Sequence, residues 1–331
     1  GSPPSPDIDW RPGAGREMLA RRACLKRRLR ETLDGRGWLE IDAPCLIDSP
    51  DFEPNIALFR ATLPDGTPAG SLHSSPELSM KRRRCAYPDL PGLYYLGPVF
   101  RAGESGTRHN PEFSMLEWYE SGADLDGGIE TTLALIRTAA EALDRPAPPV
   151  THREYGALFR EHCHLDPYTA DAGALRSAAA TAGITLNDPA DMGRDDWLDL
   201  LMSTVIEPRF EPDTLTVVSG YPESQAAMAR LQRRAFEGRV VTVASRFEVY
   251  GGTLELANGY FELTDPSEQA CRLAETNPAS SDSRSQQRFI RALEQGLPDC
   301  TGVALGVDRL LMWLTGSEDI DAVLPFSRRR V

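Results

Sequence analysis

The stretch from Arg101 to Glu120 reads RAGESGTRHNPEFSMLEWYE and decides the fold. Its second half is apolar and aromatic, like the run from Leu93 to Arg101 that precedes it, and the polar segment AGESGTRHNP separates the two. Two apolar runs joined by a polar, glycine-bearing segment predict an antiparallel hairpin with a long loop. A sheet built from such hairpins, with helices around it, predicts an α+β domain.

Alternate residues of a strand point to the same side of a sheet, so the second run has one face with aromatic, acidic and phenolic groups. That face consists of Phe113, Met115, Glu117 and Tyr119. It suits a flat base and an ammonium group, although an ordinary half-exposed strand carries such residues too, and this strand alone favours that simpler interpretation. The loop before it adds the charged side chains Arg101, Glu104, Arg108 and His109. Guanidinium groups match the geometry of phosphates, so the hairpin resembles a nucleotide cradle.

A second hairpin is predicted by SRFEVYGGTLELANG, residues 245–259, because Gly251 and Gly252 can form a two-residue turn. In that register Glu248 faces Glu255 directly across the ladder. Like charges at this separation, roughly 5 Å between Cβ atoms, destabilise a hairpin, so the pair calls for a counter-charge. Mg²⁺ bound by one or two carboxylates and by substrate phosphates supplies it. An edge hairpin whose acids point into solvent is an equally weighted alternative.

Helical segments precede these hairpins. Apolar residues recur at helical spacing from Glu17 to Gly37, and a short strand is expected from Trp38 to Ile41. Another helix is expected from Ser75 to Arg84, because serine hydroxyls stand at its start and Pro76 follows them. Residues 1–16 are rich in proline and glycine and are expected to be disordered.

The second half of the chain continues the same scheme. Residues from about 125 to 210 are alanine-rich and predict a mostly helical insertion in a catalytic domain that spans residues 17–331. Strands resume at Leu215 to Val218, and GVALGVDRLLMWLTG, residues 302–316, predicts a strand that leads into a helix. Arg309 lies just inside that helix. A helical arginine usually forms a surface salt bridge, and Arg309 alone does not change that expectation.

Bulk properties exclude several classes of function. The chain has 331 residues, 41% of them hydrophobic, and no apolar run approaches the roughly 20 residues that span a bilayer. Its net charge of −13 argues against a protein that coats nucleic acid. Its 6 cysteines are widely separated, which predicts reduced thiols rather than a zinc site or disulfides. We therefore expect a cytoplasmic protein without a membrane partner.

Two local clusters of basic residues oppose this negative charge. They are Arg21, Arg22, Lys26, Arg27, Arg28 and Arg30 in the first expected helix, and Lys81, Arg82, Arg83 and Arg84 in the second. Solvated helix faces are the favoured interpretation, and a docking surface for a partner is the alternative.

Three strings together resemble a known family. FRAGESGTRHNPEFSMLEWYE, RFEVYGGTLELANGYFELTD and GVALGVDRLLM are similar to motifs 2 and 3 of class II lysyl-tRNA synthetases. The helical segment that ends in DAP, residues 42–44, is similar to motif 1. The similarity runs from about residue 17 to 327 and is greatest to the synthetase paralogues that transfer lysine to elongation factor P. The resemblance implies a class II synthetase-like antiparallel sheet flanked by helices, with ATP and Mg²⁺ as cofactors.

The resemblance also implies roles for individual residues. Arg101 and Arg309 are expected to act on the phosphates as catalytic residues, and Glu248 and Glu255 to bind Mg²⁺. The ATP-binding residues that it implies are Arg101, Gly103, Glu104, His109, Asn110, Phe113, Glu255, Leu256, Gly306 and Arg309. The residues that it implies for the amino acid are Ser75, Pro76, Glu77, Glu117, Tyr119, Asn258, Glu262 and Ala304. Several acids suit a cationic, lysine-type substrate, because an unpaired buried charge is very costly.

Within these sets, Phe113 is expected to stack on adenine. Ser75 and Glu77 are expected to orient the α-amino end of the substrate. The side-chain ammonium group is expected to lie among Glu117, Tyr119, Asn258 and Glu262.

Two positions depart from the synthetase pattern. Synthetase motif 2 has a glutamate two residues after its arginine, where this chain has Gly103, and the acid follows one residue later as Glu104. Recognition of the adenine amino group by that side chain is thereby put in question. Ala304 replaces a glycine of the synthetase, as in the paralogue, and its methyl group is expected to change which lysine isomer fits, with (R)-β-lysine favoured.

About 16 residues precede motif 1, too few for the barrel with which lysyl-tRNA synthetases bind the anticodon, so tRNA is not expected as the acceptor. The resemblance thus predicts a homodimer that activates lysine or β-lysine with ATP and transfers it to a lysine of elongation factor P. The alternatives are a truncated synthetase that charges tRNA or a small amine, and a catalytically silent regulator that senses amino acids. The retained arginines and acids of the ATP site weigh against a silent protein.

Overall fold

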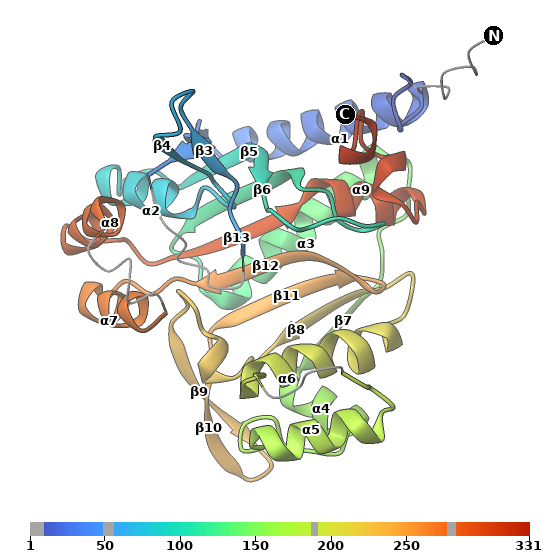
Figure 1. Cartoon of the computed structure of the whole chain (residues 1–331), viewed down its shortest axis with the longest axis vertical. Coiled ribbons are helices and arrows are strands. Elements are labelled where there is room, and N and C mark those ends of the chain that lie inside the picture. The colour runs from blue at the N-terminus through green and yellow to red at the C-terminus, as the bar shows by residue number, and fades with distance from the viewer. Residues whose placement is uncertain (1–9, 49–55, 187–190, 277–282) are drawn as a thin grey trace.

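A sheet of 8 strands lies at the centre of the chain, in the order β1-β5-β6-β13-β12-β11-β8-β7 (Figure 1). The computed structural model describes residues 10–48, 56–186, 191–276 and 283–331. The central strands from β5 to β8 pair antiparallel, and the edge pairs β1–β5 and β7–β8 are parallel. The strands are β1 (Leu39–Glu40), β5 (Gly92–Phe100), β6 (Glu112–Ser121), β7 (Val150–Glu154), β8 (Leu215–Ser219), β11 (Arg246–Gly251), β12 (Leu254–Phe261) and β13 (Cys300–Gly306). The predicted α+β class is confirmed.

The first predicted hairpin is present as β5 and β6, with Phe100 opposite Glu112 at the start of its loop. Leu116 and Trp118 point into the main hydrophobic core and are fully buried. Successive side chains of a strand point to opposite faces, so Glu117 and the residues on its side of β6 lie on the face of the sheet away from this core.

The second hairpin, β11 and β12, has a different register from the one predicted. Gly251 pairs with Leu254, so the turn consists of Gly252 and Thr253. The ladder also has a bulge between Val249 and Tyr250, just before this turn. Gly252 has a φ of +55°, a conformation that glycine adopts without strain. The bulge shifts the pairing, so Glu248 lies opposite Asn258 and the predicted pair of Glu248 with Glu255 is wrong.

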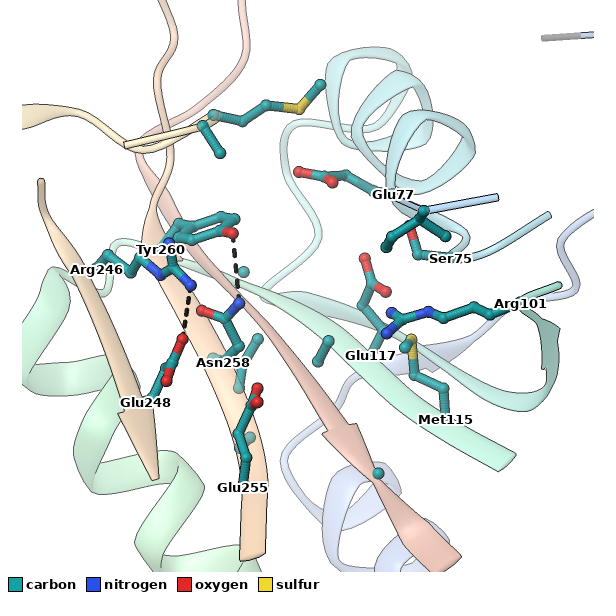
Figure 2. A pocket seen from close by; sticks show the side chains of 18 of the residues that line it. Ser75, Glu77, Arg101, Met115, Glu117, Arg246, Glu248, Glu255, Asn258 and Tyr260 are labelled. Atoms are coloured by element: carbon teal, nitrogen blue, oxygen red, sulfur yellow. Dashed lines mark hydrogen bonds and ion pairs between the residues drawn. The ribbon is translucent and has the colours of Figure 1, made fainter. Parts of the chain in front are cut away.

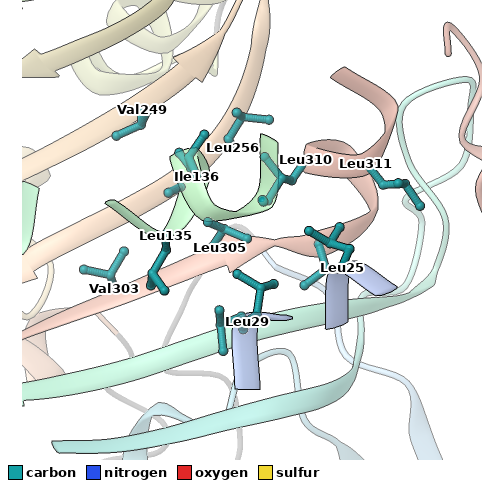
Figure 3. Close-up of a cluster of buried hydrophobic side chains, with 14 of the residues drawn as sticks. Leu25, Leu29, Leu135, Ile136, Val249, Leu256, Val303, Leu305, Leu310 and Leu311 are labelled. Atoms are coloured by element: carbon teal, nitrogen blue, oxygen red, sulfur yellow. The ribbon is translucent and has the colours of Figure 1, made fainter. Parts of the chain in front are cut away.

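Helices cover the sheet and enclose the main core (Figures 1 and 3). The predicted first helix is confirmed as α1 (Arg16–Gly35), whose fully buried Leu25 and Leu29 belong to this core. The others around the sheet are α2 (Glu77–Ala86), α3 (Leu125–Ala142), α7 (Pro266–Thr276), α8 (Arg284–Glu294) and α9 (Val307–Thr315). Burial of each such leucine contributes roughly 2 kcal/mol, which fixes α1, α3 and α9 against one face of the sheet.

Residues from about 125 to 210, predicted as one mostly helical insertion, belong partly to the main domain and partly to a separate helical lobe. Its first helix, α3, packs in the main core, and β7 joins the edge of the main sheet. A separate hydrophobic cluster lies in the segment that follows, around Trp197 and Phe159. That helical lobe contains α4 (Tyr155–Cys163), α5 (Ala172–Thr181), α6 (Arg194–Leu201), a π-helical turn (Met202–Ile206) and a 3₁₀ turn (Glu207–Arg209). Residues 187–190 lie outside the described residues.

Two smaller sheets complete the fold. One contains β2 (Leu46–Ile47), β3 (Arg60–Thr62) and β4 (Pro68–Leu72), and the other contains β9 (Leu231–Phe236) and β10 (Arg239–Ala244). Residues 1–9 of the segment that we expected to be disordered lie outside the described residues. Gly13 and Ala14 of that segment donate backbone hydrogen bonds of 3.0 and 2.9 Å to Pro325 and Leu324, so the ordered chain begins before residue 16.

Helix α2 begins two residues later than predicted, at Glu77, and no side chain caps it. Ser75, one of the serines expected at its start, has a buried hydroxyl that finds no hydrogen-bond partner among the described residues. Across the described residues, no helix is both long and apolar enough to cross a membrane.

Candidate active site

A cavity of about 600 Å³ opens on the face of the sheet opposite the main core (Figure 2). All but two of the residues that the family resemblance implies contribute to its wall, the exceptions being Pro76 and Gly103. The implied residues on the wall are Ser75, Glu77, Arg101, Glu104, His109, Asn110, Phe113, Glu117, Tyr119, Glu248, Glu255, Leu256, Asn258, Glu262, Ala304, Gly306 and Arg309. Segments far apart in the sequence therefore meet at one site.

The floor of the cavity is a row of paired residues across four strands. Glu248 lies opposite Asn258, Asn258 opposite Ala304, and Ala304 opposite Glu117. Residues on one rung share a face of the sheet, so an acid, an amide, a methyl group and a second acid stand side by side. The sheet itself fixes their order.

Arg309 defines one end of the cavity. Its guanidinium group donates to the backbone oxygens of Arg108 and Glu255, each at 3.3 Å, and to Nε2 of His109 at 2.7 Å. Because arginine only donates, Nε2 of His109 must be an unprotonated acceptor. Burial, and after it the charge of Arg309, lowers the pKa of His109, which is consistent with a neutral ring. The fixed guanidinium group is thus positioned for an anionic ligand.

Arg101 lies at the same end, above the ring of Phe113, with 5.2 Å from Cζ to the ring centroid. Its Nε is buried without a hydrogen-bond partner among the described residues, and its Nη1 is 3.9 Å from Oε1 of Glu104. A buried, unsatisfied donor favours an acceptor supplied by a ligand. Gly103 has a φ of +81°, a conformation in which glutamate would be strained.

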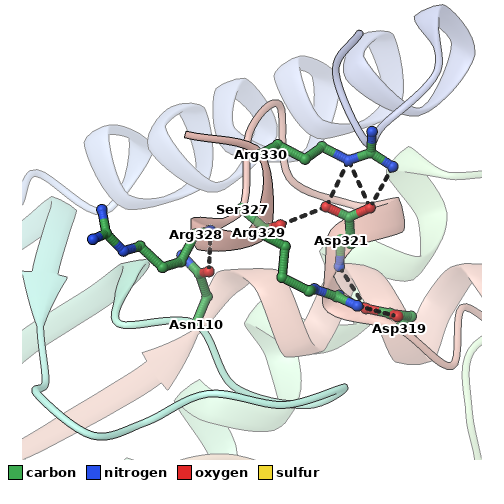
Figure 4. A network of polar contacts seen from close by, with 7 residues as sticks. All are labelled: Asn110, Asp319, Asp321, Ser327, Arg328, Arg329 and Arg330. Carbon is green, nitrogen blue, oxygen red and sulfur yellow. Dashed lines mark hydrogen bonds and ion pairs between the residues drawn. The ribbon is translucent and has the colours of Figure 1, made fainter. Parts of the chain in front are cut away.

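Both polar atoms of the Asn110 side-chain amide form hydrogen bonds within the protein. Its Nδ2 donates to the backbone oxygen of Glu112 at 2.6 Å, and its Oδ1 accepts from the backbone N–H of Arg328 at 2.8 Å (Figure 4). The segment that holds it is fixed in turn, because Arg330 donates to both carboxylate oxygens of Asp321. Asn110 therefore joins the nucleotide loop to residues 319–330.

Glu248 is held on both of its carboxylate oxygens. Oε1 accepts from Arg246 at 2.6 Å, and Oε2 accepts from the hydroxyl group of Tyr250. The same hydroxyl lies 3.0 Å from Oε1 of Glu207. Burial raises the pKa of Glu207 to about 7, so this carboxyl can be protonated and donate to Tyr250.

The carboxylate of Glu255 forms no hydrogen bond with the described residues. Burial, and after it the nearby charge of Glu248, raises the pKa of Glu255 to about 7. A partly buried carboxylate that forms no hydrogen bond with the described residues and lies near a second acid fits a divalent cation, which prefers oxygen ligands. The oxygens of Glu248 also keep free lone pairs. The described residues contain no group of three or more metal-binding side chains, so ligands would also come from the substrate.

The other end of the cavity is acidic. The hydroxyl group of Tyr119 donates to Oε1 of Glu117 at 2.8 Å, and both side chains are buried. Oδ1 of Asn258 and Oγ of Ser75 are buried and lack hydrogen-bond partners in the described part of the chain. Acceptors and acids in this arrangement favour a ligand that carries N–H donors.

Two further acids at this end share a buried lysine. Nζ of Lys81 lies 2.7 Å from Oε1 of Glu77 and 2.5 Å from Oε2 of Glu262. Gly302 makes room for this arrangement, because a Cβ atom there would collide with Glu262 and with the ring of Tyr119. The predicted subsite acids are therefore present, but two of them already have an internal partner.

The basic cluster of residues 81–84 is not the surface patch that the sequence suggested. Lys81 and Arg84 are completely buried. Arg84 donates to the backbone oxygen of Leu90 at 2.7 Å and to Ser121, and Lys81 pairs with acids of the cavity. A charged side chain can be buried where hydrogen-bond and ion-pair partners compensate its charge. The hydropathy of the sequence does not reveal those partners, because they lie elsewhere in the chain.

Sequence reasoning missed three residues of the site. Lys81 was assigned to a surface cluster, although its spacing of four from Glu77 indicates a helical ion pair. Arg246 was not considered, although it stands two residues before Glu248 and hence on the same face of the strand. Gln269 on α7 lines the cavity with a buried, unsatisfied Oε1, and no local signal indicated it.

The chain belongs to the class II tRNA synthetases of the D, K and N group, whose family profile matches residues 7–330. It is 34% identical over 336 residues to the elongation factor P--(R)-beta-lysine ligase of Hamiltonella defensa, which covers 97% of this chain and 98% of the relative. The ligase of the same name from Vibrio cholerae is 35% identical over 327 residues, 96% of this chain and 97% of the relative. That of Haemophilus ducreyi is 34% identical over 332 residues, 98% and 97% of the two chains.

Proposed function

We propose that this chain activates a lysine-type amino acid, in first place (R)-β-lysine, with ATP and transfers it to a lysine side chain of elongation factor P. The observation that carries the proposal is the polarity of the cavity, with Arg101 and Arg309 at one end and three acids at the other. A substrate with a carboxylate at one end, an ammonium group at the other and a second ammonium group between them matches this polarity. The named relatives, which match this chain over nearly its whole length, support the choice of acceptor.

The reaction has two steps. In the first, a carboxylate oxygen of the amino acid attacks the α-phosphorus of ATP, and pyrophosphate leaves. In the second, the ε-amine of the acceptor lysine attacks the carbonyl carbon of the adenylate. AMP leaves with the electron pair of the broken C–O bond, and the amine loses a proton. The product is an amide, so the acceptor must present its amine unprotonated.

The residues of the chain act mainly by position and charge. Arg101 and Arg309 bring two guanidinium groups to the phosphates, where they stabilise the charge that develops on the oxygens. Arg309 needs little reorganisation, because three contacts fix it before the substrate arrives. Phe113 offers one face of a ring to adenine. Glu248 and Glu255 would hold Mg²⁺, which would supply further neutralisation of the phosphates.

The amino-acid end binds by charge and by hydrogen bonds. Glu117, oriented by Tyr119, accepts from an ammonium group, and the amide oxygen of Asn258 accepts beside it. Ser75 is placed to orient the other amino group. The closed acidic end excludes amino acids with apolar side chains, since these would leave the acids without partners.

We propose that the reaction takes place in the cytoplasm and that the chain acts as a homodimer, as class II synthetases generally do. The test is an acceptor assay. The protein is incubated with ATP, labelled lysine or β-lysine, and either elongation factor P or tRNA. We expect label on elongation factor P, and none on a variant factor whose acceptor lysine is replaced by arginine. Label on tRNA with an unlabelled factor would refute the proposal, as would the absence of any amino-acid-dependent pyrophosphate exchange.

A further inference from the structure

Helix α7 contributes one wall of the cavity. Residues of α7 that follow one another at helical spacing line the cavity from a single face of the helix, and they are Gln269, Arg272, Leu273 and Thr276. Arg272 fixes this face, because its Nη1 donates to the backbone oxygens of Ala227 and Ala229 at 2.9 and 2.7 Å. Ala227 also lines the cavity, so α7 is tied to a second segment of the wall.

The wall formed by α7 borders the acidic end of the cavity. Leu273, one turn after Gln269 on the same face, packs in the hydrophobic cluster that contains Tyr119 and Met228. The sulfur of Met228 lies 3.4 Å from Nζ of Lys81, which forms ion pairs with two acids of the cavity. Gln269 is therefore placed at the end that is expected to bind the side-chain ammonium group of the amino acid.

The side-chain amide of Gln269 is buried and incompletely satisfied. Gln269 is 1% exposed, and its Oε1 finds no hydrogen-bond partner among the described residues. An unpaired buried acceptor is costly, and folded proteins keep few of them. Oδ1 of Asn258, on β12, is buried without a partner in the same part of the structure and belongs to a residue that lines the same cavity. Two amide oxygens from different elements thus lack donors at one site.

A ligand group with several N–H donors would satisfy such oxygens. An ammonium group has three N–H donors and no acceptor. ATP has N–H donors only in the amino group of adenine, and the base is expected beside Phe113, at the end of the cavity where Arg101 lies. The side-chain ammonium group of a lysine-type amino acid is therefore the better match for the amide oxygen on α7.

We propose that Gln269 is a specificity-determining residue, whose Oε1 accepts a hydrogen bond from the side-chain ammonium group of the bound amino acid. An apolar side chain in the same place would leave this oxygen unpaired, so the contact discriminates against such amino acids. Helix α7 thereby becomes part of the amino-acid site, although the family resemblance implied none of its residues. The inference rests on the proposed function and adds a contact for its substrate.

The experiment uses the full chain and two substitutions of similar size. Gln269→Met removes the amide, whereas Gln269→Glu keeps an acceptor oxygen in its place. Amino-acid-dependent pyrophosphate exchange gives the KM for the lysine isomer and for ATP. Because a hydrogen bond to a charged group is lost, we expect Gln269→Met to raise the KM for the amino acid at least about tenfold, with the KM for ATP within about twofold. Gln269→Glu should raise the KM for the amino acid less than Gln269→Met does.

Thermal unfolding of the ligand-free chains separates binding from a structural role. Gln269→Met removes a buried acceptor that has no partner among the described residues, so its Tm should be equal to that of the wild type or higher. Glu275→Met, on the exposed side of the same helix, is the matched control and should change neither KM value. A Gln269→Met chain with a lower Tm, or one that does not fold, would show that Gln269 has a structural partner and would overturn the inference.

The kinetic results can overturn it as well. They do so if Gln269→Met keeps the wild-type KM for the amino acid, if the KM for ATP rises equally, or if Gln269→Glu is the more damaging variant. Failure of the wild type to exchange pyrophosphate with any lysine isomer would instead refute the proposed function.

Discussion

Asn258 and Glu117 flank Ala304 in one row of the sheet, on β12, β6 and the strand between them. The Ala304 methyl group lines the cavity in the middle of this row. On one side of it lies the amide oxygen of Asn258, which has no hydrogen-bond partner in the described part of the chain, and on the other the buried carboxylate of Glu117. A ligand whose ammonium group reaches both must therefore pass over the methyl group. Its size determines how closely the backbone of the amino acid can approach the sheet.

Ala304→Gly should change which lysine isomer is preferred. Removing one methyl group from the wall of a pocket is worth about tenfold in discrimination. We expect the ratio of kcat/KM for α-lysine to that for β-lysine to rise by about this factor. The ratio is measured by pyrophosphate exchange with each isomer. An unchanged ratio would show that Ala304 does not contact the substrate.

Gly302→Ala should damage amino-acid binding without affecting ATP. The new Cβ would collide with Glu262 and with the ring of Tyr119, both of which are buried and cannot move away easily. We expect the KM for the amino acid to rise at least about tenfold, with the KM for ATP within about twofold. Gly35→Ala is the control, since a Cβ atom there meets nothing within 4 Å. Equal effects on both substrates would contradict the placement of Gly302 at the amino-acid end.

Arg84→Leu should destabilise the protein, whereas Arg82→Leu should not. Arg84 is buried and donates to the backbone oxygens of Tyr87 and Leu90 and to Ser121, so its loss leaves buried acceptors unsatisfied. The expected cost is about 2 kcal/mol in the free energy of unfolding, against less than about 0.5 kcal/mol for the exposed Arg82. Urea denaturation of both variants measures the difference. Equal midpoints would mean that Arg84 is not buried in solution.

The main elements of the fold could be predicted because their signals are local. The alternation of β6 and the helical spacing of Leu25, Leu29 and Leu33 depend only on neighbouring residues, and the structure has both. The register of β11 and β12 could not be predicted, because the bulge arises from pairing with neighbouring strands. All but two of the residues that the family resemblance implies line one cavity, and their roles there stay predictions. The resemblance could not reveal that Lys81 pairs with two acids of that wall, because burial of a charge depends on partners distant in sequence.

The last prediction concerns Glu255, whose partly buried carboxylate has no hydrogen-bond partner among the described residues. Its pKa is raised from 4.5 to about 7, so the folded chain binds this proton more tightly than the unfolded chain does. Stability therefore falls as the pH rises from about 4.5 to 7, and above that the ionised acid costs about 3 kcal/mol.

Glu255→Gln removes that cost. The ligand-free variant should be more stable than the wild type at pH 8. At pH 4.5 the two should be nearly equal, because the acid is protonated in the folded state and still about half protonated in the unfolded state. The same variant should lose the stabilisation that Mg²⁺ and ATP give to the wild type, because a ligand of the cation is gone. Thermal unfolding at the two pH values, with and without Mg²⁺ and ATP, measures both effects. A variant that is less stable than the wild type at pH 8 would show that Glu255 has a structural partner. A variant that Mg²⁺ and ATP stabilise as much as the wild type would show that Glu255 is not a metal ligand.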